Sequence, residues 1–236
     1  MTIKVGILQT GGPPPPLPER FGSYSTMVQE LLGPQHEFTT FEVRHGELPA
    51  RADDCAAYVI TGSASGVYDG DPWIDALKQF VRDASGRSAM VGICFGHQVM
   101  AEAFGGQVIK SPRGWGIGLH RYDVRERAAW MDDANSIAVP ASHQDQVVKL
   151  PSDARVLGGS DFTPFGIIEY PQRRAMSLQS HPEFSPEYAA ALIELRRSSK
   201  YTNEQADRAL QTLREQNDRT RVGAWLAEFL RSNVRG

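Results

Sequence analysis

The sequence predicts an α/β fold: a doubly wound, mainly parallel sheet with an antiparallel extension and extra helices at the C-terminal end. Over residues 3–106, apolar strand-like runs alternate with helical segments, the order that builds a parallel sheet. Over residues 107–180, short strand-like pieces follow one another between glycines, prolines and aspartates, which is typical of hairpins. After Pro186 the pattern is helical.

The composition indicates a globular protein with a substantial core. The chain has 236 residues, of which 41% are hydrophobic and 22% charged, and its formal net charge is −3. No basic stripe runs through it, so we do not expect a nucleic acid ligand. The only cysteines, Cys55 and Cys94, make a disulfide framework untenable and suit a reducing compartment. No run approaches the roughly 20 apolar residues of a membrane span, and no secretory signal is recognisable, so we expect a cytoplasmic protein without membrane contact.

The first part of the chain supplies the parallel sheet. We expect strands at residues 3–9, 37–43, 56–61 and 90–93, and helices at residues 21–32, from 72 onward and 97–104. Gly11-Gly12 and the prolines Pro13–Pro16 interrupt the chain after the first strand. We therefore expect a loop over Thr10–Glu19, either beside a ligand site at the carboxyl end of that strand or as a rigid surface connection.

The second part supplies the extension and the final helices. We expect strands at residues 107–110, 117–124, 136–139, 147–150, 155–158, 166–170 and 175–179, and helices at 187–198, 203–217 and 220–233. The middle helix, with Asn203 as its cap, is very polar, so we expect it to lie solvated on the surface, with docking to a partner as the alternative. The final helices either cover the sheet or form a contact in a homo-oligomer.

The strongest chemical signal lies in residues 89–106. Gly92, Cys94 and Gly96 form a G-x-C-x-G pattern between a strand and a helix, and this pattern is typical of a nucleophile elbow. Gly105-Gly106 predicts a left-handed end to that helix. The free N–H groups at the helix start favour a thiolate on the cysteine. The alternative is a buried cysteine in a tight turn.

A cysteine nucleophile needs a base and a group that orients the base. His181 and Glu183 follow a predicted strand, and side chains two apart on extended backbone point to the same side. Acyl transfer also needs donors for the developing oxyanion. The N–H groups of Phe95 and Gly62 are candidates, although Gly62 alone also fits an ordinary turn at the end of a strand.

GICFGHQ together with SHPE resembles the class I, or triad, glutamine amidotransferases, and the chain is similar to the amidotransferase domain of GMP synthetase. The resemblance covers about residues 3–195 and includes the blocks VITGSASGVYDGDPWI, VGICFGHQVMAEAFGG, SPRGWGIG, SHQDQV and LQSHPEFS. It implies a flavodoxin-like fold. Residues 1–200 are then the amidotransferase domain, and residues 201–236 are a helical extension packed on it.

The resemblance also implies a role for each candidate residue. Cys94 attacks the side-chain amide of glutamine and forms a γ-glutamyl thioester; His181 is the acid and base, and Glu183 orients it. Gly62 and Phe95 form the oxyanion hole. The glutamyl group is contacted at its amino-acid end by Gln98 and by a loop of Ser142, His143, Gln144 and Asp145. Ammonia leaves and water releases glutamate, without a metal or cofactor.

Three functions stay open at this point. The first is an amidase that passes ammonia to a separate synthetase or transferase. The second is a hydrolase of γ-glutamyl amides or peptides with the same thioester. The third is a non-catalytic regulatory module, against which the intact Cys94, His181 and Glu183 argue. No ATP-pyrophosphatase motif or P-loop is present. The first two functions differ in the leaving-group pocket, for which Pro13–Pro16 and Ser63–Asp71 are the candidate walls.

Overall fold

The protein, described here as a computed structural model over residues 2–234, is built on a nine-stranded sheet. The strand order is β2-β1-β3-β4-β11-β10-β9-β6-β7, and a small second sheet pairs β5 with β8. The strands are β1 Lys4–Gln9, β2 Glu37–Glu42, β3 Ala57–Ile60, β4 Ala89–Ile93, β5 Gln107–Lys110, β6 Gly116–Val124, β7 Ser136–His143, β8 Asp145–Lys149, β9 Arg155–Gly159, β10 Ile167–Tyr170 and β11 Ala175–Leu178. The helices are α1 Leu17–Phe21, α2 Tyr24–Leu32, α3 Pro72–Ala84, α4 Phe95–Ala103, α5 Pro186–Arg196, α6 Asn203–Thr212 and α7 Arg219–Asn233, with short 3-10 helices at Val43–His45 and Pro171–Arg173.

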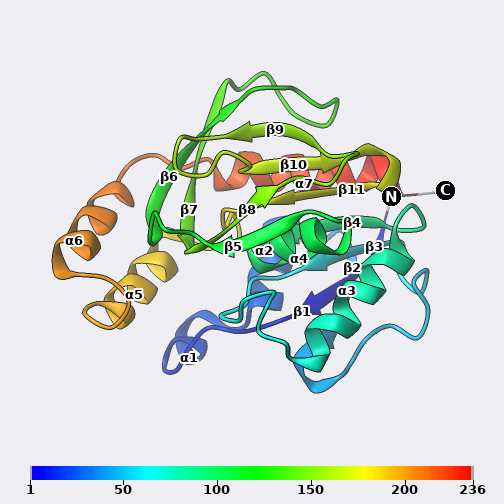
Figure 1. Cartoon of the computed structure of the whole chain (residues 1–236), viewed down its shortest axis with the longest axis horizontal. Helices are drawn as coiled ribbons and strands as arrows, with labels where there is room; N and C mark the ends of the chain where they lie inside the picture. Colours follow the sequence, from blue (N-terminus) through cyan, green and yellow to red (C-terminus); the bar gives the residue numbers. More distant parts are fainter. Residues whose placement is uncertain (1, 235–236) are drawn as a thin grey trace.

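The strands β2, β1, β3, β4 and β11 run parallel. Every residue of β3, β4 and β11 is buried, as expected for parallel strands covered on both faces. In Figure 1 the arrowheads of β1 and β11 point toward the side of the molecule where α1 and α5 lie. The predicted mainly parallel sheet is confirmed, and its carboxyl edge faces these helices.

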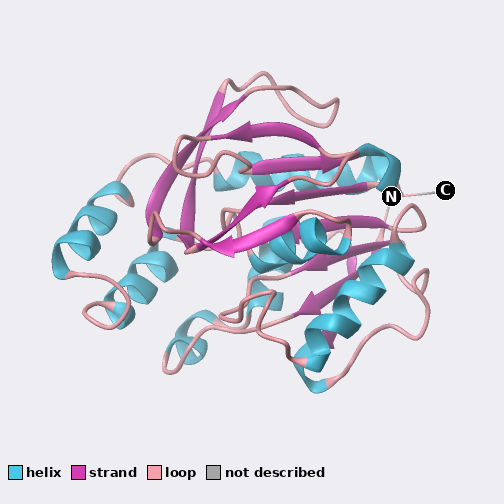
Figure 2. Ribbon diagram, viewed as in Figure 1, coloured by secondary structure: helices cyan, strands magenta, loops and turns pink. Residues whose placement is uncertain are grey.

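Helices cover both faces of the parallel strands (Figure 2). Neighbouring side chains on a strand point to opposite faces, and β3 follows this rule. Tyr58 and Ile60 belong to an apolar cluster that includes residues of α3 and α4, whereas Val59 belongs to a second cluster that includes residues of α2 and α7. The doubly wound arrangement is therefore present as predicted.

The antiparallel extension is also confirmed, since β10, β9, β6 and β7 continue the sheet from β11 in antiparallel pairs. The largest difference in strand length from the prediction is in β7. We expected it to end at Val139, but β7 continues through Pro140 to His143. Because β7 is the last strand in the sheet order, a proline is tolerated there. Ser142 and His143 thus lie in a strand rather than in a loop.

Two helix predictions need correction. The helix expected at residues 21–32 is two helices, because Gly22 adopts a positive φ of 71° and Ser23 with Thr26 forms a capping box that starts α2. Leu17 begins α1 inside the stretch predicted as a loop. Further on, Thr202 rather than the predicted Asn203 caps α6, which ends at Thr212.

The C-terminal helices cover the core. Ala206, Ala209 and Leu213 form an apolar stripe along α6 and its C-cap, which packs with residues of α5 and β6. On α7, Trp225 and Phe229 belong to the same apolar cluster as strands β1 and β3. Helix α7 thus covers part of the sheet. Among residues 2–234, no helix has the length and apolar character needed to cross a membrane.

Candidate active site

Cys94 lies at the turn between β4 and α4 with a φ of 52°, a region that side-chain-bearing residues rarely occupy. Two glycines allow this turn. A Cβ on Gly92 would lie 2.5 Å from the carbonyl oxygen of Gly96, and one on Gly96 would lie 2.4 Å from that of Ile60. At the far end of α4, Gly105 has a φ of 96°, as predicted for its left-handed end. The strand–turn–helix geometry of an elbow is thus present.

The sheet brings His181 to the same edge. The strands β11 and β4 are parallel neighbours, and Leu178 pairs with Ile93. The Cys94 N–H donates to the Leu178 carbonyl oxygen at 2.9 Å, and the His181 N–H donates to the carbonyl oxygen of Pro140 in β7 at 2.8 Å. Cys94 and His181 therefore follow the carboxyl ends of adjacent strands, as expected from the sequence.

Glu183 and Phe184 hold the buried His181 ring. A hydrogen bond of 2.7 Å joins His181 Nδ1 to Glu183 Oε1, and the ring stacks on Phe184 with centroids 3.9 Å apart. Burial alone would lower the pKa of His181, but the charges of Cys94 and Glu183 outweigh it and raise this pKa to about 10. At neutral pH the ring is therefore an imidazolium beside the Cys94 sulfur, the pairing that activates a cysteine nucleophile.

His97 and His143 differ from His181 in charge. Burial lowers the pKa of each to about 3, so both are neutral at physiological pH. The Nδ1 of His97 lies 2.9 Å from Ser177 Oγ, and the ring of His143 packs near those of His120 and Phe162. No cluster of metal-ligand side chains occurs in the part of the chain that the structure describes.

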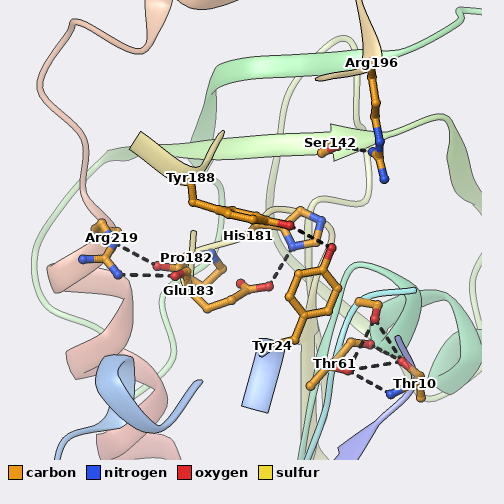
Figure 3. A network of polar contacts seen from close by, with 11 residues as sticks. Thr10, Tyr24, Thr61, Ser142, His181, Pro182, Glu183, Tyr188, Arg196 and Arg219 are labelled. Carbon is orange, nitrogen blue, oxygen red and sulfur yellow. Dashed lines mark hydrogen bonds and ion pairs between the residues drawn. The ribbon is translucent and has the colours of Figure 1, made fainter. Parts of the chain in front are cut away.

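Gly62, two residues after the end of β3, lies against the side chains of His181 and Cys94. A Cβ placed on it would lie 2.9 Å from His181 Cε1 and 3.8 Å from Cys94 Cβ. The hydroxyl of Thr10 donates to the carbonyl oxygens of Thr61 and Gly62, and the Thr61 hydroxyl accepts from the Thr10 N–H at 3.0 Å (Figure 3). These buried threonines fix the backbone on which Gly62 sits.

A cavity of about 430 Å³ opens at Cys94 and His181. It is lined by all five residues predicted to contact the glutamyl group: Gln98, Ser142, His143, Gln144 and Asp145. Of the predicted walls, Ser63–Gly66, Tyr68 and Asp69 line it. The prediction for Pro13–Pro16 is wrong, because Gly12 lines the cavity and the four prolines do not.

Comparison with known proteins identifies the family. Residues 27–195 match the family Glutamine amidotransferase class-I. This chain belongs to the class I glutamine amidotransferases. A glutamine amidotransferase-like protein of Schizosaccharomyces pombe is 29% identical over 98% of this chain and 99% of its own length. Gamma-glutamyl peptidase 2 of Arabidopsis thaliana is 29% identical over 79% of this chain and 78% of its own.

The chain is also similar to a GMP synthase subunit over part of its length, and to a solved glutamine amidotransferase structure over its whole length. One subunit of the glutamine-hydrolysing GMP synthase of Archaeoglobus fulgidus is 35% identical over 40% of this chain and 51% of its own. A crystal structure of a glutamine amidotransferase from Thermotoga maritima superposes with a TM-score of 0.78 at 18% identity, covering 100% of both chains. That similarity shows a common fold, which confirms the predicted flavodoxin-like class.

Hydrogen bonds connect the residues that are predicted to contact the substrate with their neighbours. Gln98 Nε2 donates to the Asp145 carbonyl oxygen at 2.9 Å, and the Tyr68 hydroxyl donates to Asp145 Oδ2 at 2.8 Å. Ser142 Oγ accepts from Arg196 Nη1 at 3.1 Å. Asp145 thus joins the segment after β3 to the start of α4.

Several residues around the amidotransferase site were missed by the sequence analysis. The hydroxyl of Tyr188 donates to that of Tyr24 at 3.2 Å, and both rings pack against Phe184, which stacks on His181 (Figure 3). Arg219 at the start of α7 donates to the carbonyl oxygens of Pro182 and Glu183 at 3.3 and 3.4 Å. The sequence carries no local signal for these contacts, because helix packing determines which helical side chains reach the site.

Proposed function

We propose that this amidotransferase hydrolyses γ-glutamyl amides larger than glutamine, through a thioester on Cys94. The observation that carries the proposal is the cavity of about 430 Å³ on Cys94. This volume falls in the range of about 300–1,000 Å³ typical of sites for drug-sized ligands, so it has room for a leaving group larger than ammonia. The similarity to gamma-glutamyl peptidase 2 over most of both chains supports the same choice.

The first half of the reaction follows from the pair of Cys94 and His181. The Cys94 thiolate attacks the γ-carbonyl carbon of the glutamyl group. The N–H groups of Gly62 and Phe95 donate to the developing oxyanion. The His181 imidazolium gives its proton to the departing nitrogen, the C–N bond breaks, and the amine leaves. The γ-glutamyl thioester remains, and His181 is now neutral.

The second half returns the enzyme to its starting state. Neutral His181 takes a proton from a water molecule, which attacks the thioester carbonyl carbon. The C–S bond breaks, glutamate leaves, and the imidazolium and thiolate are restored. Glu183 keeps its hydrogen bond with Nδ1 throughout, so the Nε2 of the ring stays available to the reaction. Gln98 and residues 142–145 contact the amino-acid end of the glutamyl group.

A second candidate is a glutaminase whose ammonia is used by a separate synthetase or transferase. The similarity to one of the subunits of a GMP synthase favours it. The thioester chemistry is the same in both candidates, and only the leaving group differs. In this case we expect weak turnover of glutamine by the isolated chain, and none of larger γ-glutamyl compounds.

The deciding experiment measures glutamate release by the purified chain from glutamine and from a panel of γ-glutamyl amides and peptides. Cys94→Ala is run beside Cys55→Ala, which removes the other buried cysteine. We expect turnover of γ-glutamyl conjugates above glutamine, lost by about 10⁴-fold or more in Cys94→Ala and retained in Cys55→Ala. Turnover of glutamine alone favours the second candidate. Equal rates for Cys94→Ala and the wild type contradict both.

A further inference from the structure

Buried threonine side chains continue the contact between β1 and β3 beyond the ends of the two strands. The main-chain pairing of these strands extends to Leu8 and Ile60. Two residues further on, Thr10 Oγ1 lies 2.9 Å from the Thr61 carbonyl oxygen and 3.1 Å from that of Gly62 (Figure 3). Both threonines are fully buried, and Thr10 is not one of the residues that line the cavity. Thr10 can therefore act on the site only through the chain that follows β3.

The hydroxyl of Thr10 fixes the direction of two successive peptide groups. The carbonyl groups of Thr61 and Gly62 both turn toward this hydroxyl. In a planar trans peptide, the N–H points opposite to the C=O. The N–H groups of these two peptides belong to Gly62 and Ser63, so both point away from Thr10. Neither N–H has an acceptor among residues 2–234, and successive N–H groups on one side of the chain form a concavity that suits an anion.

The order of the strands determines where these N–H groups point. In the sheet, β3 lies between β1 and β4, so carbonyl groups that turn toward Thr10 leave their N–H groups turned toward β4, which Cys94 follows. The surroundings of Gly62 agree. A Cβ on Gly62 would lie 3.8 Å from Cys94 Cβ and 2.9 Å from His181 Cε1. A Cβ on Gly11, next to Thr10, would lie 3.1 Å from the Gly62 carbonyl oxygen.

We propose that Thr10 is a positioning residue for the oxyanion hole: its hydroxyl holds the peptide groups on both sides of Gly62, so that their N–H groups point at the oxyanion formed when Cys94 attacks. The inference rests on the proposed function, which supplies that oxyanion. Glycine restricts its backbone least of all residues, so the peptides at Gly62 need an outside contact to keep one orientation. Donors that are oriented before the reaction need no reorganisation in the transition state.

Removal of the Thr10 hydroxyl tests this role. Thr10→Val keeps the shape and the N–H of the residue but removes the donor, whereas Thr10→Ser keeps the donor. We measure glutamate release from γ-glutamylglycine and from glutamine, and the rate of alkylation of Cys94 by iodoacetamide, a displacement that forms no oxyanion. We expect kcat of Thr10→Val to fall about 10- to 100-fold, with KM and the alkylation rate unchanged. Thr10→Ser should recover most of the loss in kcat.

Ser88→Ala is the matched control. Ser88 is also buried, and its hydroxyl also donates to two carbonyl oxygens, those of Ala52 at 3.1 Å and Cys55 at 2.9 Å. It lies just before β4, whereas Cys94 lies just after that strand. The variant therefore removes the same kind of contact at the opposite end of the strand, and it should leave kcat and the alkylation rate unchanged.

The outcomes separate the role of Thr10 from the proposed function. Equal losses of turnover and alkylation in Thr10→Val would overturn the inference, because the hydroxyl would then support the fold or the thiolate. A wild-type kcat in Thr10→Val, or the same loss in Ser88→Ala, would overturn it as well. If wild type turns over glutamine alone, the proposed hydrolase fails, but a loss of that turnover in Thr10→Val with normal alkylation still supports the inference. Turnover of neither compound, with Cys94 alkylated, would overturn both.

Discussion

At the carboxyl edge of the parallel strands, the backbone places the groups that we propose to react, whereas other residues of the cavity lining come from helices. Cys94, His181 and Gly62 follow β4, β11 and β3, which are sheet neighbours, and main-chain hydrogen bonds hold two of them in place. Arg196 and Tyr24 reach the same cavity from α5 and α2. Under the proposed function, residues at the sheet edge carry out the chemistry, whereas helix residues contribute to the lining of the substrate cavity.

The largest effect is expected where the orienting carboxylate is removed from the sheet edge. Glu183→Gln takes away a charge that favours the His181 imidazolium, so we expect kcat to fall about 10²- to 10⁴-fold. The alkaline limb of the pH profile of kcat/KM should also move to lower pH. Glu187→Gln, on an exposed residue of α5, is the control. It should change neither kcat nor the alkaline limb of the pH profile. An unshifted alkaline limb in Glu183→Gln would contradict the assigned role.

The same variant has a consequence for stability. The folded-state pKa of His181 is about 10, against an ordinary value of 6.5. The protonated ring therefore stabilises the fold fully below about pH 6.5, and this contribution is lost as the pH rises through about 10. We expect Tm to fall over this range more in wild type than in Glu183→Gln, measured by thermal unfolding at several pH values. An equal fall in Tm in wild type and in Glu183→Gln would contradict the interaction between His181 and Glu183.

An intermediate effect is expected at Gly62. An alanine there would place its Cβ 2.9 Å from His181 Cε1, so the ring must move, and we expect kcat to fall about 10²- to 10³-fold. Gly12→Ala is the control in the lining of the same cavity, because a Cβ there meets no atom within 4 Å. If Gly62→Ala and Gly12→Ala have equal kcat, close packing at Gly62 plays no part in catalysis.

The smallest effect is expected at Arg219, where a helix supports the sheet edge from outside. Arg219→Met removes two hydrogen bonds to the carbonyl oxygens of Pro182 and Glu183, and we expect less than about a 10-fold loss in kcat with a destabilisation of about 1–2 kcal/mol. Arg214→Met, on an exposed residue of the same C-terminal segment, should change neither quantity. A loss as large as that of Glu183→Gln would erase the contrast between sheet and helices.

The sequence predicts the sheet edge well because its signals are local. Gly92 and Gly96 flank Cys94, and His181 and Glu183 lie two apart beside a predicted strand. The helices around the cavity are harder to predict. The start of α2 at Tyr24 depends on Gly22 and on a capping box, and the sequence does not show whether Arg196 or Arg197 faces the cavity. Both Glu194 and Asp207 pair with Arg197, and Asp207 can do so only after α6 has packed beside α5.

The most direct test of the account is to look for the thioester itself. The purified chain is mixed with a γ-glutamyl substrate, quenched in acid, digested and analysed by mass spectrometry, with Cys94→Ala in parallel. We predict one added glutamyl group on the wild-type peptide that contains Cys94, and none in the variant. An active enzyme without this adduct, or with the adduct on Cys55, would contradict the account.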